Sequence, residues 1–277
     1  MNRATLVAAA ATLTIAAAAC VPPNPPPVPE GREIAAMSFN IHHGVGTDAV
    51  LDLDRIATTV NQSGAEVVGL QEVDRHFSER STFVDQATYL ADNLGMHVVF
   101  GANLDLDPLN PGEPRRQYGN AILSRFPIMS WSNTLLPLLP GGEQRGLLEA
   151  TLDIDGVPLT AYSTHLQHDS QEARLAQVEA ITQLLADSNS SVLVLGDLNA
   201  TPDSPEIVAM VEDLTDTWVE AGVGDGYTYS TTNPSVRIDY VLTSADIAAR
   251  TAAVVISDGS DHLPVVATLT LPPSTGV

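Results

Sequence analysis

The sequence predicts an α/β domain in which two β-sheets pack face to face and are covered by helices. Three observations lead to this fold class. Short runs rich in β-branched residues alternate with helical patterns from Ile34 onward. The runs that suit strands outnumber the patterns that suit helices. No Pro-rich linker interrupts these runs after residue 31, so we expect one domain over residues 32–273.

The first 20 residues, MNRATLVAAAATLTIAAAAC, predict an export signal, because one early Arg precedes an Ala-dominated apolar stretch. The AAAC ending resembles a bacterial lipobox, so we expect Cys20 to become the lipidated first residue of a cell-envelope lipoprotein. Simple cleavage and secretion is the alternative, since Ala17 is smaller than the residue usual at its position. Cys20 is the only cysteine, which excludes an intramolecular disulfide. Residues 21–31 are Pro-rich and indicate an extended spacer.

The predicted elements of the domain follow in chain order. Strand candidates are β-branched or aromatic runs bounded by turn residues, namely IAAMSFNI, EVVGLQEV, HVVFGANL, NAILSRFPI, LLEATLDI, PLTAYSTHL, SVLVLGDLN, RIDYVLTS, AAVVIS and LPVVATLTL. Helix candidates are residues 53–62, 84–94, 170–185 and 204–211. The third has the clearest apolar face, which is expected to contain Leu175, Val178, Ile181, Leu184 and Leu185.

The charge of the chain is strongly negative. Its 12 basic residues are all Arg, against 34 Asp and Glu, which gives a formal net charge of −22. Catalysis by a lysine is therefore excluded. A surface of this sign repels polyanions, although a local cationic or metal-filled site can still bind phosphate. Nucleic acid is a possible but disfavoured substrate.

Polar side chains recur where apolar strand candidates end. Asn40 ends MSFN, Glu72 ends VVGLQE and His165 ends YSTH. Open sheets assemble their sites at such strand ends, although any one of these residues alone is more simply a turn former. Glu72 is neither a strand former nor a favoured turn residue, so it indicates a partner, and a divalent cation is the expected one.

Three further segments carry residues suited to chemistry. Asp197 and Asn199 lie two apart in GDLNA, so an extended chain would direct both side chains to one phosphate or water. Asp261 and His262 directly precede the apolar run LPVVATLTL. Arg145 follows a Gly-rich turn and is either a substrate-binding cation or a solvated charge at a strand edge.

Together these segments resemble the endonuclease/exonuclease/phosphatase family of metal-dependent phosphoesterases, which includes pancreatic deoxyribonuclease and neutral sphingomyelinases. The matching segments, in family order, are SFNIHHG, LQEVD, YGNAILSR, QRGLLEA, STHL, GDLNA, RIDYVL and SDHLPV. They extend over residues 34–271. The resemblance implies a four-layer α/β sandwich of two mixed β-sheets flanked by helices.

The resemblance also implies a role for each matched residue. Mg²⁺ or Mn²⁺ is expected to be bound by Asn40, Glu72 and Asp261. Asp197 is expected to orient or deprotonate the attacking water, and Asn199 to donate to the phosphoryl oxygens. His165 and His262 would flank the phosphate, with Asp239 orienting His262. Whether Asp197 or a histidine takes the proton stays open at this point.

The implied substrate-binding residues are Arg145, Tyr118 and Asn120. Tyr118 and Asn120 lie where the deoxyribonuclease branch carries Tyr and Glu, so Asn120 would have to orient His165 as a neutral partner. His42 and His43 are expected to line the cleft or pack near it rather than bind a metal, because no Cys or spaced His cluster accompanies them.

The expected function is that of an exported, divalent-metal-dependent phosphoesterase that hydrolyses phosphodiester or phosphomonoester bonds. A small or lipid-linked substrate is favoured, and the protein is expected to act as a monomer. One alternative is a secreted DNA endonuclease or exonuclease. An alternative of another class is an inactive surface-binding module with the same fold, which a complete set of site residues disfavours.

Overall fold

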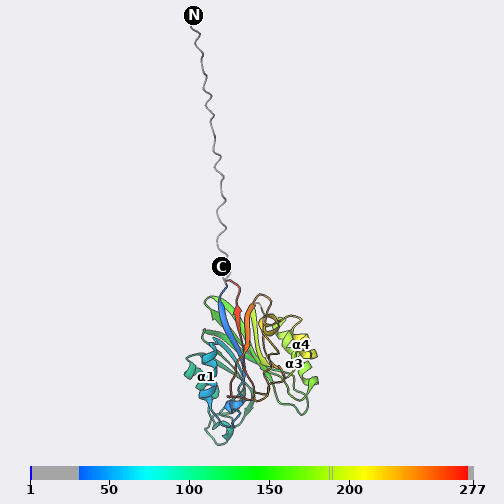
Figure 1. Cartoon of the computed structure of the whole chain (residues 1–277). Helices are drawn as coiled ribbons and strands as arrows, with labels where there is room; N and C mark the ends of the chain where they lie inside the picture. Colours follow the sequence, from blue (N-terminus) through cyan, green and yellow to red (C-terminus); the bar gives the residue numbers. More distant parts are fainter. Residues whose placement is uncertain (2–30, 187, 189, 274–277) are drawn as a thin grey trace. The chain divides into compact units, whose positions relative to one another are not determined.

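The computed structural model describes Met1, residues 31–186, Ser188 and residues 190–273 (Figure 1). The predicted export signal and Pro-rich spacer, apart from Met1 and Gly31, lie outside the described residues. Among the described residues, no helix is both long enough and apolar enough to cross a membrane.

One six-stranded sheet has the spatial order β11-β12-β1-β2-β4-β3. Its strands are β1 (Glu33–Asn40), β2 (Val67–Arg75), β3 (His97–Leu106), β4 (Arg116–Ser124), β11 (Ala248–Val254) and β12 (Val265–Thr270). The pair β1 and β2 is parallel, while the other neighbours are antiparallel. The sheet is therefore mixed.

The second six-stranded sheet has the order β5-β6-β7-β8-β10-β9. Its strands are β5 (Ile128–Leu135), β6 (Gly146–Ile154), β7 (Val157–His165), β8 (Ser191–Asp197), β9 (Thr215–Asp216) and β10 (Asp239–Thr243). Again one pair, β7 and β8, is parallel and the others are antiparallel. Each mixed sheet thus places the carboxyl ends of its parallel pair at one edge.

The helices cover the outer faces of the sheets. Helices α1 (Leu53–Ser63) and α2 (Gln86–Leu94) share a buried cluster with the first sheet. Helices α3 (Gln171–Ala186) and α4 (Pro205–Met210) share one with the second sheet. Figure 1 shows α1 on one side of the two sheets and α3 and α4 on the other. The short α5 (Thr217–Ala221) contacts β11 and β10.

A third buried cluster fills the space between the two sheets. Ile122 of β4 and Val67 of β2 belong to it, together with Leu148 of β6 and Leu195 of β8. Removal of such apolar side chains from water contributes about 25 cal/mol per Å² of buried area, so this central layer holds the sheets together. The predicted four-layer α/β sandwich of two mixed sheets flanked by helices is confirmed.

Two details of the prediction are wrong. Leu175 and Leu184 of α3 are 39% and 37% exposed, because the buried stripe runs through Gln177, Val178 and Ile181 instead. The Gln177 amide is satisfied there by the backbone N–H of Gln167 and the carbonyl of Pro137. The segment NAILSRFPI is not one strand, since β4 ends at Ser124 and β5 begins at Ile128, with Pro127 in the turn between them.

Candidate active site

The candidate site lies where strands of both sheets end or begin. Asn40 is the last residue of β1, His165 of β7 and Asp197 of β8. His165 is opposite Asp197 in the parallel pair, and β10 starts at Asp239, also opposite Asp197. Residues far apart in the sequence are thus brought to one edge of the fold.

Asp197 is the centre of this group, and it is only 1% exposed. Its Oδ2 accepts a hydrogen bond from Asn40 Nδ2 at 3.0 Å, and its Oδ1 accepts one from the backbone N–H of Asn199 at 3.0 Å. Burial raises the pKa of Asp197 to about 7, against the opposing effect of the His262 charge. A carboxyl group with this pKa can take up and release a proton near neutral pH.

His262 and Asp239 form a buried pair, with His262 Nδ1 2.9 Å from Asp239 Oδ2. Burial by itself lowers the pKa of His262, but the charges of Asp239 and Asp197 outweigh it and raise the pKa to about 10. The ring is therefore an imidazolium at neutral pH. Its Nε2 lies 3.6 Å from Asp197 Oδ2, so a positive charge faces the central carboxylate.

His165 is the second imidazole beside Asp197, with Nε2 3.4 Å from Asp197 Oδ2. Its Nδ1 lies 3.1 Å from Nη1 of Arg145. A guanidinium only donates, so Nδ1 accepts and the ring proton is on Nε2, facing Asp197. Burial, then the Arg145 and His262 charges, holds the pKa of His165 well below its usual value. His165 is thus a neutral donor.

The protonation of His262 leads to a direct prediction. In the metal-free protein, the His262 ring is expected to stay protonated from pH 6.5 to 9, because its pKa is raised to about 10. Asp239→Asn should lower this pKa, since Asp239 contributes the largest of the effects that raise it. Nitrogen chemical shifts of the ring, followed by NMR across this pH range, measure both values.

Asp203→Asn provides the matched control for this titration, because Asp203 is an exposed aspartate outside the site. It should leave the His262 titration unchanged. A wild-type His262 ring that loses its proton near pH 6.5 would contradict the assignment of an imidazolium.

Asn40 connects the two carboxylates of the site. Its Nδ2 donates to Glu72 Oε1 at 3.0 Å as well as to Asp197, so the amide nitrogen lies between the two carboxylates. Its Oδ1 accepts from the backbone N–H of His42 at 3.0 Å and keeps a second lone pair, so the metal contact expected of Asn40 stays a prediction. Asn40 therefore positions Glu72 and Asp197.

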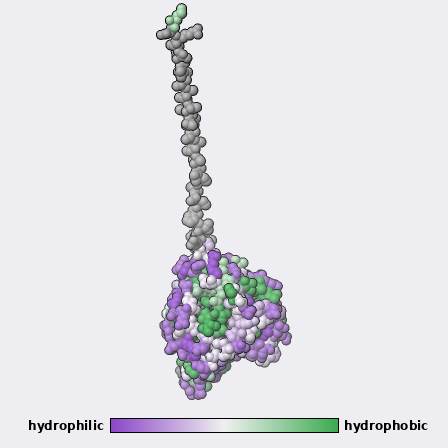
Figure 2. Space-filling view, in the orientation of Figure 1, coloured by the Kyte–Doolittle hydropathy of each residue, from purple (hydrophilic) through white to green (hydrophobic). Residues whose placement is uncertain are grey.

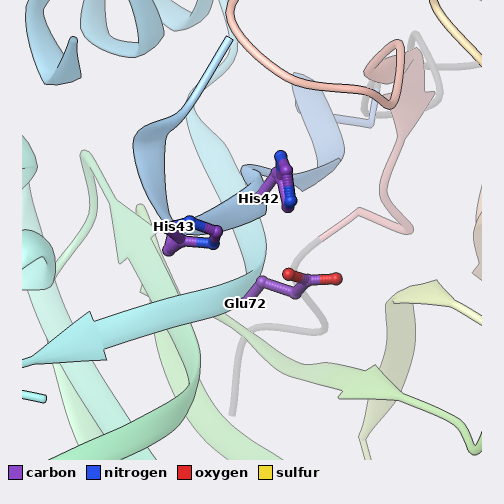
Figure 3. Close-up of side chains that lie close together, drawn as sticks. All are labelled: His42, His43 and Glu72. Carbon is purple, nitrogen blue, oxygen red and sulfur yellow. The ribbon is translucent and has the colours of Figure 1, made fainter. Parts of the chain in front are cut away.

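Glu72 lies at a register shift of β2, between Leu70 and Val73, and has a left-handed φ of 59°. The shift turns its side chain toward His42 and His43, and one ligand atom from each of the three residues lies within 4.8 Å of the others (Figure 3). The expectation that both histidines only line the cleft missed this cluster. A sequence pattern of adjacent histidines gives no sign that a distant Glu joins them.

Asp261 was predicted as a metal ligand, and it does not belong to the Glu72 cluster. Its Oδ1 lies 3.8 Å from Nδ1 of His42 and 3.3 Å from Oγ of Ser260. The single hydroxyl proton of Ser260 goes to the carbonyl of Asn40, at 2.7 Å, and its Oγ accepts from the N–H of His262. This serine, which sequence reasoning did not select, fixes the 260–262 segment to the end of β1.

Asn199 is not directed as expected, because β8 ends at Asp197 and Asn199 has a left-handed φ of 48°. The segment is therefore not extended, and Asn199 Nδ2 donates to the carbonyl of Leu166 at 3.1 Å. Arg145, expected to bind substrate, is 3% exposed and pairs with Glu143 at 2.9 Å beside His165.

The prediction that Asn120 orients His165 is wrong. Asn120 Nδ2 donates to the carbonyls of Gly146 and Ser163, and Arg145 occupies the position beside His165 Nδ1. Tyr118 lies on the Glu72 side of the site, where burial, followed by the Glu72 charge, raises the pKa of its hydroxyl well above the usual value. The hydroxyl therefore stays protonated and can donate.

Tyr229 is a site residue that sequence reasoning missed. Its ring centroid lies 4.9 Å from that of His262, and its side chain is 39% exposed, so it forms part of the wall beside the imidazolium. Thr228, next to it, accepts the backbone N–H of Asp239 at 3.3 Å and thereby holds that strand end. No local pattern in GYTYSTT indicates either contact.

The model of the endonuclease/exonuclease/phosphatase family matches residues 37–262 of this chain. Protein cwh43 of Schizosaccharomyces pombe is 30% identical over 169 residues, which are 61% of this chain but only 16% of cwh43. The match thus spans about a sixth of the length of that relative. The uncharacterized protein YbhP of Escherichia coli is 26% identical over 253 residues, covering 85% of this chain and 95% of YbhP.

A crystal structure of an endonuclease/exonuclease/phosphatase from Beutenbergia cavernae is similar in fold. It has a TM-score of 0.75 at 28% sequence identity, and the alignment covers 87% of this chain and 72% of the other.

Proposed function

This chain belongs to the endonuclease/exonuclease/phosphatase family, whose members hydrolyse phosphoester bonds, and we propose that it is a divalent-metal-dependent hydrolase of small or lipid-linked phosphoesters. The observation that carries the proposal is the convergence of Asp197, His165 and the His262–Asp239 pair at one buried edge. A module that had lost its activity would have no need of a complete buried set of this kind.

In the proposed reaction, Asp197 takes the proton of the attacking water. Burial raises its pKa to about 7, which matches the task of a general base near neutral pH. Asn40 and the backbone N–H of Asn199 fix the two carboxylate oxygens, so the carboxylate keeps its direction while water attacks phosphorus.

The two histidines stabilise the charge that develops on the phosphoryl oxygens. His262 supplies a fixed positive charge, because Asp239 keeps its ring protonated. His165 supplies a neutral N–H from Nε2, because Arg145 occupies its Nδ1. Both donors are buried, where electrostatic interactions are stronger than in water.

The residues of the site fit a divalent cation at Glu72. Glu72 Oε1 accepts the N–H of Asn40, and among the described residues Oε2 has no hydrogen-bond partner, so one carboxylate oxygen is open to a ligand. We propose Mg²⁺ or Mn²⁺ as the cofactor class. When bound, such a cation supplies positive charge to the phosphoryl oxygens.

Glu72→Gln tests this assignment. The variant should keep the fold, since Gln retains the shape of Glu, but lose the charge that holds the cation. We expect kcat to fall by a factor of about 10² or more and the dependence on added metal to weaken. Steady-state rates across a metal titration measure both. Full activity in Glu72→Gln, or wild-type activity that survives a chelator, contradicts metal dependence at this residue.

The distribution of charge supports a small or lipid-linked substrate over nucleic acid. Among the described residues, every arginine except Arg116 and Arg125 lies within 4.0 Å of a carboxylate. Proteins that bind duplex DNA neutralise several phosphates with free basic side chains. This chain, with no Lys and a net charge of −22, offers no such track within the described residues.

Exposed apolar side chains support a lipid-linked substrate in particular. Val223 and Ile256 are 89% and 84% exposed and line one pocket with Tyr227. Tyr227 is two residues from Tyr229, which contacts His262. Figure 2 shows an apolar area surrounded by hydrophilic surface on one face of the protein. Exposed apolar groups beside a site suit a substrate with acyl chains.

The test is a substrate panel with the purified protein. Sphingomyelin, a phosphoinositide, a mononucleotide ester and plasmid DNA are each supplied with Mg²⁺ or Mn²⁺ at about 150 mM salt, where exposed charges more than ~8 Å apart are largely screened. Small or lipid-linked esters should give the higher kcat/KM. Efficient DNA cleavage with all other esters inert would support the nuclease alternative, and no hydrolysis at all would support the inactive module.

We also propose that the protein is exported and tethered through Cys20, which lies outside the described residues. Acylation of Cys20 would anchor the chain, because each buried CH₂ adds ~0.8 kcal/mol and several chains act together. Cys20→Ala should convert a protein extracted only by detergent into a soluble or uncleaved one. Wild-type protein found free in the medium, cut before Cys20, contradicts the tether.

A further inference from the structure

The cluster of His42, His43 and Glu72 has a composition that the proposed reaction does not require. One ligand atom of each residue lies within 4.8 Å of the others, and Figure 3 shows the two rings and the carboxylate gathered around one space. We propose that these three side chains bind a divalent transition ion of the Zn²⁺ or Co²⁺ type in preference to Mg²⁺. This deepens the proposed function, on which it rests for the catalytic use of the ion: the carboxylate that is open to Mg²⁺ or Mn²⁺ would hold Zn²⁺ or Co²⁺ more tightly, because the two histidines join it.

His42 is oriented as a metal-binding histidine would be. Its Nδ1 lies 3.2 Å from the carbonyl of Val45, which only accepts, so the ring proton is on Nδ1. The lone pair is then on Nε2. Metal-binding histidines usually donate their other ring N–H to a carbonyl or carboxylate. Asp261, 3.8 Å from the same Nδ1, adds a carboxylate to this side of the ring.

His43 has a buried ring nitrogen, Nδ1, without a hydrogen-bond partner among the described residues. Buried polar atoms are nearly always paired, and an unpaired one often indicates a missing ion or water. The backbone of His43 is fixed, because its carbonyl accepts from Gln86 Nε2 at 2.7 Å while Gln86 Oε1 accepts the N–H of Asp74 in β2. His43 is therefore held against the strand that carries Glu72.

The backbone at all three residues is in the left-handed region. His42 has φ of 45°, His43 of 43° and Glu72 of 59°. Residues with a Cβ adopt this conformation rarely and at a cost, and such residues concentrate at ligand sites. Three of them, from two segments far apart in sequence, direct their side chains to one place. Binding of a ligand by the three side chains would explain why the protein keeps this strained backbone.

The local charge favours a cation. Glu72 carries one negative charge, and Asp261 lies behind His42. Arg80 is a cation whose charge acts on His43, and it donates two hydrogen bonds to Asp74, at 2.9 and 2.7 Å. Arg145 is likewise paired with Glu143. A divalent ion therefore meets no uncompensated positive charge from these two arginines.

The ligand types select the ion. Mg²⁺ prefers an octahedral shell of oxygen atoms and retains several waters. Two imidazole nitrogens and one carboxylate instead match ions such as Zn²⁺ and Co²⁺, which accept nitrogen readily and are bound by two His and one Glu in known catalytic sites. Replacing either histidine should remove this preference while leaving the oxygen ligand for Mg²⁺.

The test measures metal binding to the full chain by calorimetry, without substrate. Zn²⁺ and Mg²⁺ are titrated into wild type, His42→Gln, His43→Gln and the control His97→Gln. His97 is exposed at the start of β3. It pairs with Ser124 at the end of β4, so it lies at the other end of the strands from the site. Co²⁺ added to each protein gives a visible absorption band whose position and intensity change with the ligands and their geometry, independently of activity.

We expect wild type to bind one Zn²⁺ about 100-fold or more tightly than Mg²⁺. Each of His42→Gln and His43→Gln should lower the affinity for Zn²⁺ by a factor of about 10 to 100. A loss of at least this size is seen when a residue that supports a metal ligand is removed. Mg²⁺ binding should change by less than about threefold, and the Co²⁺ band should weaken. His97→Gln should behave as wild type.

Equal affinity of wild type for Zn²⁺ and Mg²⁺, or unchanged Zn²⁺ binding in both histidine variants, overturns the inference. Thermal unfolding of each variant shows that it is folded, and if His43→Gln is not, His43→Asn replaces it. Selective Zn²⁺ binding in a protein that hydrolyses no phosphoester would sink the proposed function but leave this site intact. Hydrolysis of a phosphoester by a protein whose histidine variants keep the metal preference of wild type would support the proposed function and overturn the inference about this site.

Discussion

Asp197→Asn is expected to lower kcat/KM for phosphoester hydrolysis by a factor of about 10³, which is the middle of the range for loss of a general base. Asn preserves the volume and can still accept the N–H of Asn199, but it cannot take a proton from water. Asp197 is also the residue that Asn40, His165 and His262 all face. Initial rates at saturating metal measure the loss.

The same variant tests the pH dependence of stability. Because burial raises the pKa of Asp197 to about 7, the ionised carboxylate lowers the stability of the folded state. That cost grows as pH rises from about 4 to about 7 and is complete above it, so Asp197→Asn should gain relative stability over this interval. Urea unfolding at both pH values checks the sign. The exposed Asp203→Asn is the control for both measurements, and a rate in Asp197→Asn within tenfold of wild type would contradict its role as base.

The second large effect concerns Asp239 and His262, which should act as one unit. Asp239 Oδ2 lies 2.9 Å from His262 Nδ1, and its charge keeps the ring protonated. Asp239→Asn and His262→Ala should each lower kcat/KM by a factor of about 10² or more, and the double variant should be little worse than His262→Ala. The rates of wild type, the two single variants and the double variant give a double-mutant cycle that measures this coupling.

The exposed pair of Arg32 and Asp155 provides the control for the cycle, because it lies on the surface with 3.1 Å between the charges. Asp155→Asn should leave the rate within about twofold, as surface ion pairs contribute little. Losses in Asp239→Asn and His262→Ala that multiply in the double variant would show that the two residues act independently.

The sequence was sufficient for the fold class and for much of the central site, for a physical reason. Apolar runs define strands, and the ends of these strands place Asn40, His165 and Asp197 together. This placement does not depend on the conformation of the loops. It depends on the pattern of burial, which the sequence records directly. The pairing of Asp239 with His262 is implied by the family resemblance alone, and no strand pattern indicates it.

Other features depend on side-chain direction and could not be read from the pattern. Which atom of Asn40 faces Glu72 is decided by the N–H of His42, and the left-handed backbone of Asn199 turns its amide to Leu166. Arg145, rather than Asn120, contacts His165. In α3 the buried Gln177 shifts the apolar face, because its amide finds backbone partners that no helical periodicity predicts.

The central claim is that water, deprotonated at Asp197, attacks phosphorus. Hydrolysis of the best substrate of the panel in water enriched in oxygen-18, followed by phosphorus NMR and mass spectrometry of the products, tests it most directly. We predict one oxygen-18 atom in the phosphoryl product, none in the released alcohol, and a rate of incorporation about 10³-fold lower in Asp197→Asn. Label in the alcohol, or incorporation at the wild-type rate in Asp197→Asn, would contradict the claim.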